Sequence, residues 1–107
     1  MSKIQFESNG TTYTLEFDRN SVTKAEKMFD LSLQEVTSGK VTAVRELFMA
    51  AFIKHHPHIK PSVANGFFDA MPDKSALYEK LVEMYGETVG TLLDEPDEGK
   101  AISWKVM

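Results

Sequence analysis

The stretch VTAVRELFMAAFIKH, residues 41–55, places a helix at the centre of the fold because that helix has almost no polar side. Its charged side chains are confined to Arg45, Glu46 and Lys54. One face carries Val41, Val44, Leu47, Phe48, Ala51 and Phe52, while Met49 and Ile53 lie roughly opposite. A helix that is apolar nearly all round is expected inside a packed domain. Pro57 ends it, because proline has no N–H to continue the helical hydrogen bonds.

Shorter helices are predicted upstream of this segment. Asn20 or Ser21 can cap a helix that carries on one side Val22, Ala25, Met28 and Phe29. Ser32 followed by Glu35 has the spacing of a capping box, which opens a short turn. Gly39 is placed to close that turn.

Two helices are predicted downstream. Pro61 is suited to a first helical position and begins a helix with Val63, Phe67 and Phe68, which Met71-Pro72 ends. Asp73 then caps a last helix that runs to about Leu93.

The last predicted helix has a wider apolar face than one core requires. The apolar arc spans about 180°, against roughly 100° for a helix facing one core. It consists of Leu77, Tyr78, Leu81, Val82, Met84, Tyr85, Val89, Leu92 and Leu93. Either the helix lies between two neighbours in the same chain, or part of the arc contacts another chain. Gly86 and Gly90 lie at the edge of the arc, where a second backbone could approach.

The first residues have the pattern of a β-hairpin. Apolar and polar residues alternate on both sides of Asn9-Gly10, a pair that favours a tight hairpin turn because both residues tolerate positive φ. Near the end of the chain, Ile102, Trp104 and Val106 alternate with polar residues and predict a third strand on this sheet. The expected fold class is α+β, with an N-terminal hairpin and a C-terminal strand packed on a bundle of about four helices.

Length and composition limit the classes of function. A chain of 107 residues accommodates one domain, here residues 1–107. The formal net charge of −4 argues against nucleic acid as a partner, since such binding depends on Lys and Arg. No segment has the length of a membrane span or the pattern of a signal peptide, and there is no cysteine. A cytoplasmic protein without a membrane partner is expected.

Three histidines follow the central helix in the string HHPH. A zinc enzyme needs three converging ligands, but His55 and His56 are consecutive on a helix and diverge by about 100°. His58 lies beyond Pro57 and points away again. We therefore expect His55 near the apolar face as a core residue, and His56 and His58 over the helix-terminal carbonyls. A metal-dependent enzyme built on the three histidines stays open as a minor alternative.

Other catalytic patterns are incomplete. Ser21 and Lys24 form an S-x-x-K string without the companion motifs of a serine acyltransferase, and Gly39-Lys40 lacks the upstream glycine of a phosphate-binding loop. The acidic segment 94–99 contains a proline that breaks the calcium-loop pattern. We expect no enzymatic activity, no cofactor and no metal.

Three strings in the same order resemble a small family of phage and prophage proteins. They are YTLEFDRNSV at 13–22, AFIKHHPHIKP at 51–61, and EKLVEMYGETVGTLLDEPDEGKAISWKV at 79–106. This family consists of tail assembly chaperones of long, flexible-tailed phages, encoded beside the tape-measure protein. The resemblance covers nearly the whole chain.

The resemblance implies a non-enzymatic function in the host cytoplasm. Such a chaperone binds the long helical tape-measure protein, keeps it soluble, helps to recruit tail-tube subunits and is absent from the mature virion. Self-association into a homo-oligomer is also expected. The alternative is a small regulatory or inhibitory binding module encoded by a mobile element.

Surplus apolar helix surface is the expected contact with the client. A groove that accepts an amphipathic helix contacts apolar residues at helical spacing on that helix. Methionine side chains in such a groove can adapt to partners of different sequence. The expected partner-binding residues are Met49, Ile53, Phe67, Phe68, Met71, Tyr78, Val82, Tyr85 and Val89.

Overall fold

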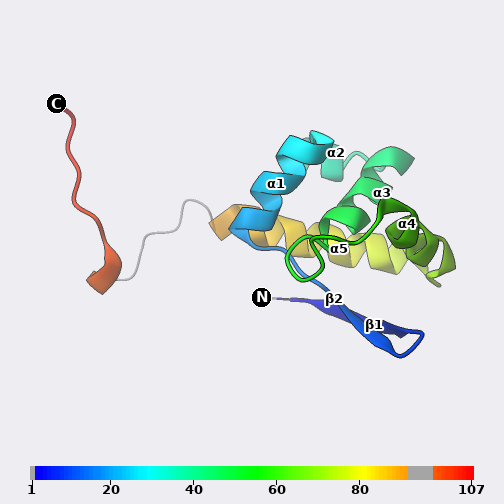
Figure 1. The fold of residues 1–107 in the computed structure, drawn as a ribbon. Coiled ribbons are helices and arrows are strands. Elements are labelled where there is room, and N and C mark those ends of the chain that lie inside the picture. The colour runs from blue at the N-terminus through cyan, green and yellow to red at the C-terminus, as the bar shows by residue number, and fades with distance from the viewer. Residues whose placement is uncertain (1, 92–97) are drawn as a thin grey trace.

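The computed structural model describes residues 2–91 and 98–107. A two-stranded antiparallel hairpin lies beneath a layer of helices, which makes the fold α+β (Figure 1). The elements are β1 (Ile4–Ser8), β2 (Thr11–Leu15), α1 (Arg19–Phe29), α2 (Leu33–Val36), α3 (Val41–Ala50), α4 (Pro61–Ala70), α5 (Lys74–Gly90) and a 3-10 turn η2 (Glu98–Lys100). None of the helices in these ranges is long and apolar enough to cross a membrane.

The predicted hairpin is confirmed. Asn9 and Gly10 form its turn with φ of 52° and 80°, the left-handed conformation that a tight hairpin turn of this kind needs. The register pairs Phe6 with Tyr13, and their rings stack with centroids 5.3 Å apart. The same two rings contact Phe67 of α4. Aromatic packing on one face therefore holds the hairpin against the helices.

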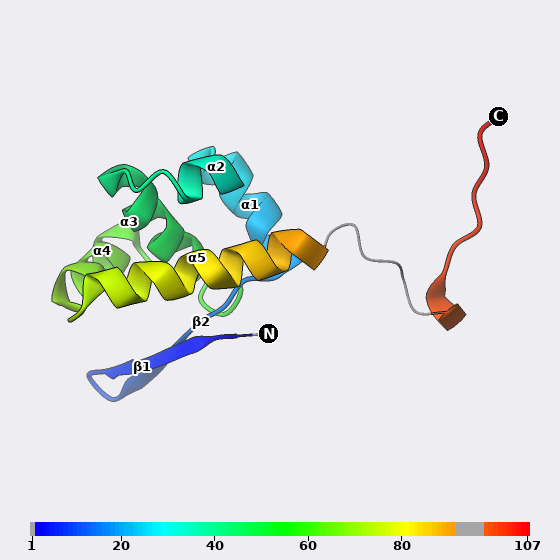
Figure 2. The same ribbon diagram turned by 180° about the vertical axis from the view of Figure 1, so that it is seen from behind.

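The predicted C-terminal strand is not formed. The sheet of the described residues has two strands, and residues 101–107 have no regular secondary structure. Figures 1 and 2 both show this segment extended away from the helices. The alternation of Ile102, Trp104 and Val106 favours a strand, but strand pairing needs a partner edge, and the segment does not lie beside the hairpin.

Most of the helix caps lie at the residues that the sequence predicts. Asp18, rather than the predicted Asn20 or Ser21, caps α1: its carboxylate accepts from Ser21 N–H at 2.7 Å. Ser21 completes a capping box because its hydroxyl accepts from Asp18 N–H at 2.9 Å. The predicted cap at Ser32 is confirmed, with Glu35 N–H as its donor. Gly39 follows with φ of 77°, as a turn-closing glycine should.

The central helix α3 is buried at Leu47 and Phe48 as predicted, but Val41 in its first turn is exposed, and the helix ends at Ala50, five residues before His55. The backbone beyond it tightens, since Phe52 N–H donates to Met49 O and Ile53 N–H donates to Ala50 O. The carbonyl of Ala51 accepts instead from Glu16 N–H, 3.0 Å away, just after β2. The helix therefore ends where its backbone joins the hairpin strand.

The helices α4 and α5 begin where predicted. Pro61 occupies the first turn of α4, and Asp73 caps α5 through Ala76 N–H. The predicted end of α5 near Leu93 lies outside the described residues. Figure 2 shows α5 crossing the layer of helices, and it packs against α1, α2 and α3. Packing against several neighbours in one chain accounts for most of its wide apolar arc.

Candidate functional site

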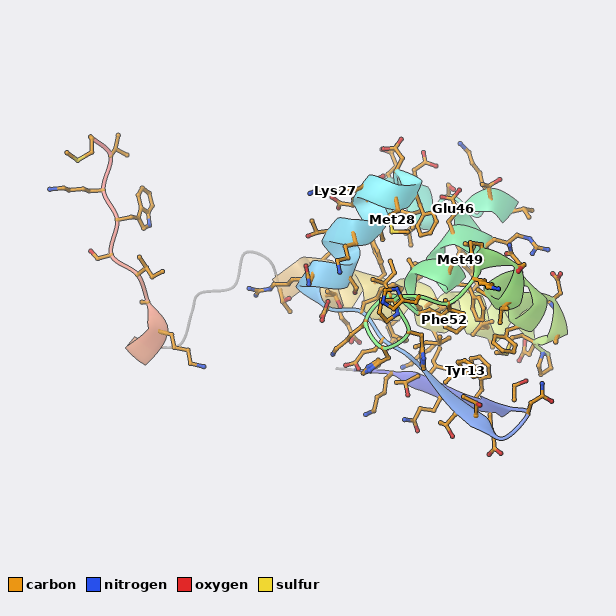
Figure 3. The ribbon with its side chains drawn as sticks, in the orientation of Figure 1. Tyr13, Lys27, Met28, Glu46, Met49 and Phe52 are labelled. Carbon is orange, nitrogen blue, oxygen red and sulfur yellow. The ribbon has the colours of Figure 1, made fainter. Side chains whose placement is uncertain are left out.

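An apolar groove opens between the end of α1, the end of α3 and the segment leading into α4. We call it the methionine groove, and its volume is about 100 Å³. It is lined by Met28, Phe29, Met49, Phe52, Ile53, His56, Pro57, Ile59, Pro61 and Ala64. Figure 3 shows Met28 and Met49 on neighbouring helices, with Phe52 between them and Tyr13 of the hairpin.

Met28 is the most exposed large hydrophobic side chain of this groove. It is 65% exposed, although the sequence placed it on the same side of α1 as the buried Val22 and Ala25. Its neighbour Phe29 is half-buried and packs on the core. An exposed methionine gives the groove an adaptable apolar rim, because its thioether chain is flexible and polarizable.

Buried aromatic rings form the floor of the groove. Phe52 is fully buried and packs edge-on against Phe48, with ring centroids 5.2 Å apart. The ring of His56 lies 6.1 Å from Phe52 and supplies the polar group of the lining. Its Nε2 accepts a hydrogen bond from Thr14 N–H at 3.0 Å. Burial, with a smaller contribution from the charge of His55, lowers the pKa of His56.

Carboxylates lie on one side of the apolar groove, beyond Phe29. Phe29 also borders a second depression, which contains Asp30, Glu35 and Glu46 beside Lys40. Glu26 and Lys27 lie on the adjoining face of α1. The side of the groove next to Phe29 is therefore mainly acidic, whereas Lys60 lies between the lining residues Ile59 and Pro61 on the other side.

The predicted partner-binding residues fall into several places. Met49 and Ile53 line the methionine groove. Phe67 and Met71 line a different depression, the β1 hollow, which lies between β1 and α4. It is lined by Phe6, Glu7, Ser8, Phe67, Ala70 and Met71.

The other predicted partner-binding residues lie in or against the core. Phe68 and Tyr85 are buried, so their assignment to a partner surface is wrong: burial inside the monomer leaves no ring surface for a partner. Val82 and Val89 are partly buried against the core. Tyr78 is also partly buried, and its hydroxyl donates to Val36 O at 2.7 Å.

The histidines do not converge. His55 was expected in the core but is exposed, and its Nε2 lies 2.8 Å from Glu16 Oε1. His56 does not cover a helix-terminal carbonyl, because its ring turns toward the hairpin backbone, and His58 is exposed. Within residues 2–91 and 98–107, no group of three His, Cys, Asp or Glu side chains is arranged to hold a metal.

Sequence reasoning found Met49 and Ile53 but missed the rest of the groove. Met28 was only placed on the same side of a helix as Val22, Ala25 and Phe29, and Pro57 and Pro61 were taken only as helix boundaries. Two prolines close behind a helix end do signal a loop with restricted backbone freedom. The side chain that faces such a loop depends on tertiary packing.

The chain belongs to the family described as Domain of unknown function (DUF5055), whose model matches residues 1–107. No curated protein and no solved structure matches the chain significantly.

Proposed function

We propose that this member of the DUF5055 family is a non-enzymatic tail assembly chaperone of a long-tailed phage. It binds amphipathic helices of the tape-measure protein in the methionine groove, keeps that protein soluble and helps to recruit tail-tube subunits. It acts in the host cytoplasm and is absent from the mature virion. The supporting observation is the exposed Met28 at the rim of an apolar groove that also contains the predicted client residues Met49 and Ile53.

The apolar lining of the groove suits the apolar side chains of an amphipathic helix. Helix-in-groove recognition places apolar side chains at i, i+3, i+4 and i+7 into an apolar channel. Here Phe52 provides a rigid floor, while Met28 and Met49 provide a rim that can adjust to different side chains. A tape-measure protein offers many similar but non-identical apolar stripes, so an adaptable rim serves it better than a rigid one.

The surrounding charge selects among helices. Asp30, Glu35 and Glu46 favour a client whose polar flanks carry Lys or Arg, and they disfavour an acidic one. Charges at the rim mainly affect the association rate and its salt dependence. Binding is therefore expected to weaken as the salt concentration rises.

Co-expression with the neighbouring tape-measure gene tests the proposal. Met28→Lys places a charge on the groove rim, and Val41→Lys places the same charge on another exposed apolar residue that does not line the groove. Wild type and Val41→Lys are expected to keep the client soluble and to co-purify with it. Met28→Lys is expected to weaken binding at least tenfold, about 1.4 kcal/mol.

Circular dichroism of the Met28→Lys variant checks that the fold is unchanged. Equal client binding by Met28→Lys and wild type would remove the methionine groove from the proposal. An insoluble client in the presence of the wild-type chain would contradict the chaperone function itself, and would favour the regulatory binding module.

A further inference from the structure

We propose that the C-terminal segment Ala101–Met107 of one copy adds as a third strand to the free edge of β1 in a second copy. The chains would then join head to tail. This assembly uses no residue of the methionine groove, so it goes beyond the proposed chaperone function and can be tested separately.

The C-terminal segment has the pattern of a strand but no strand partner among residues 2–91 and 98–107. Ile102, Trp104 and Val106 would share one face of a strand, and they are 86%, 82% and 87% exposed. The segment extends away from the helices in both views of the ribbon (Figures 1 and 2). Burial of these three large apolar side chains, which are now exposed to water, would favour a contact that covers them.

The outer edge of β2 is already occupied. In an antiparallel hairpin, alternate residues direct their N–H and C=O groups away from the partner strand. On β2 the outward N–H of Thr14 donates to His56 Nε2 at 3.0 Å. Just beyond the strand, Glu16 N–H donates to Ala51 O at 3.0 Å. The turn after α3 thus covers this edge.

The outer edge of β1 is free. Gln5 is paired with Thr14, so its backbone groups also point outward, and the same alternation applies to Lys3 and Glu7. Within the part of the chain that the structure describes, the backbone groups of these three residues have no hydrogen-bond partner outside the hairpin. A free strand edge is a template for β-strand addition.

The β1 hollow lies on this free side. Its walls come from β1 and α4, with no contribution from β2. An added strand that continues the apolar face of Ile4 and Phe6 would direct alternate side chains toward it. Trp104 supplies a large apolar ring for this hollow, and Lys105 would project on the opposite face, the one that Gln5 occupies. Phe67 and Met71, expected from the sequence to bind a partner, would contact the incoming strand.

Such a contact joins different surfaces of the two copies. Each copy offers one edge and one segment, so the contact is heterologous and repeats until a ring closes or a filament grows. A segment folded back onto its own β1 would instead give a monomer. The two arrangements therefore predict different masses.

Sedimentation equilibrium measures the molar mass of the protein as a function of its concentration. The wild type is compared with two variants, each of which lacks one of the two contacting surfaces. Trp104→Arg disables the segment, which lies outside the packed domain, and Gln5→Pro removes an outward N–H from the β1 edge. The wild type is expected to form oligomers. For each variant alone, the dissociation constant of the oligomer is expected to be at least tenfold higher. An equimolar mixture is expected to form dimers and nothing larger, because only one intact edge and one intact segment can meet.

Glu7→Lys is a second edge variant, because it places like charge near Lys105 without altering the β1 backbone. Val41→Lys, at an exposed residue outside the β1 edge, the β1 hollow and the methionine groove, is the matched control and is expected to assemble as the wild type does. A monomeric wild type at every concentration would overturn the proposal. So would a mixture that stays monomeric, or variants that assemble as well as the wild type.

Discussion

Thr14 and His56 lie 42 positions apart in the sequence, yet the backbone N–H of Thr14 donates to Nε2 of His56 at 3.0 Å. The bond joins the hairpin to the turn that follows α3. Nε2 can accept only when it carries no proton, so the ring is neutral with its proton on Nδ1. Protonation of His56 would remove this acceptor.

Stability is therefore expected to depend on the protonation of His56. Burial lowers its pKa below the ordinary value of 6.5, so the unfolded chain binds a proton more readily than the folded one. The contribution of His56 is fully present above pH 6.5 and is lost as the pH falls through the lower, folded pKa. Urea unfolding between pH 5 and 8 measures this loss.

His56→Gln isolates the effect, because an amide oxygen can accept from Thr14 N–H and does not titrate in this range. The difference in unfolding free energy between wild type and His56→Gln removes the pH dependence that the two proteins share. As the pH falls, the wild type should lose unfolding free energy relative to His56→Gln. A constant difference from pH 5 to 8 would show that Thr14 does not depend on the neutral imidazole.

Two tyrosines allow a comparison between a hydroxyl that forms a hydrogen bond and a buried hydroxyl that forms none with the described residues. Tyr78 OH donates to Val36 O at 2.7 Å, whereas the buried Tyr85 OH has no hydrogen-bond partner among the described residues. Tyr78→Phe should lower the unfolding free energy by about 1 kcal/mol. Tyr85→Phe should leave it unchanged or raise it by up to about 1 kcal/mol, because an unpaired buried hydroxyl is costly.

Chemical denaturation of the two variants gives the comparison directly. Tyr85 packs edge-on against Phe17 with ring centroids 5.3 Å apart, and its phenylalanine variant keeps that contact. Tyr85→Ala, which removes the ring, should cost about 3–5 kcal/mol. A loss of more than about 1 kcal/mol in Tyr85→Phe would mean that the hydroxyl has a partner after all.

Local signals predicted most of the fold. The Asn9-Gly10 turn, Pro61 at the start of α4 and the Asp73 cap all depend on neighbouring residues, and all are observed. The end of α3 was placed too late because it depends on the hydrogen bond between Glu16 and Ala51, which are distant in sequence. The strand pattern at Ile102–Val106 was recognised, but strand pairing requires an edge, and no local pattern specifies which one.

The candidate site was less predictable than the fold. Met49 and Ile53 stood out because they lie opposite the main apolar face of a helix. Periodicity alone cannot separate a surface apolar residue from a core one, so Met28 was grouped with Val22 and Ala25, and Tyr85 was placed on the partner surface. The role of His56 depends on a backbone group of the hairpin, which helical periodicity does not reveal.

The end of α1 offers a stabilising substitution. Asp30 adopts φ of 55° there, a left-handed conformation that glycine tolerates better than aspartate. Asp30→Gly should raise the unfolding free energy by about 0.5–1 kcal/mol. Asp30→Ala keeps the steric cost of this conformation and should give no such gain. Thermal unfolding of both variants measures the two changes in stability. Equal changes would show that the left-handed conformation of Asp30 is not the cause of the gain.

Glu16 links the hairpin to the α3 turn through its side chain as well as its backbone. The carboxylate is 14% exposed and lies 3.1 Å from Lys54 Nζ and 2.8 Å from His55 Nε2. The hydrogen bond to His55, aided by Lys54, outweighs burial and lowers the pKa of Glu16 below its ordinary 4.5.

The contribution of Glu16 is therefore present above pH 4.5 and is lost as the pH falls through the folded pKa. Glu16→Gln should lower the unfolding free energy at pH 7 by about 1 kcal/mol, and its deficit relative to the wild type should shrink as the pH falls below 4.5. Glu79→Gln on the exposed face of α5 is the control, with a change within about 0.5 kcal/mol. If the two variants lost the same stability with the same pH profile, the ion pairs of Glu16 would not be the source of the acid sensitivity.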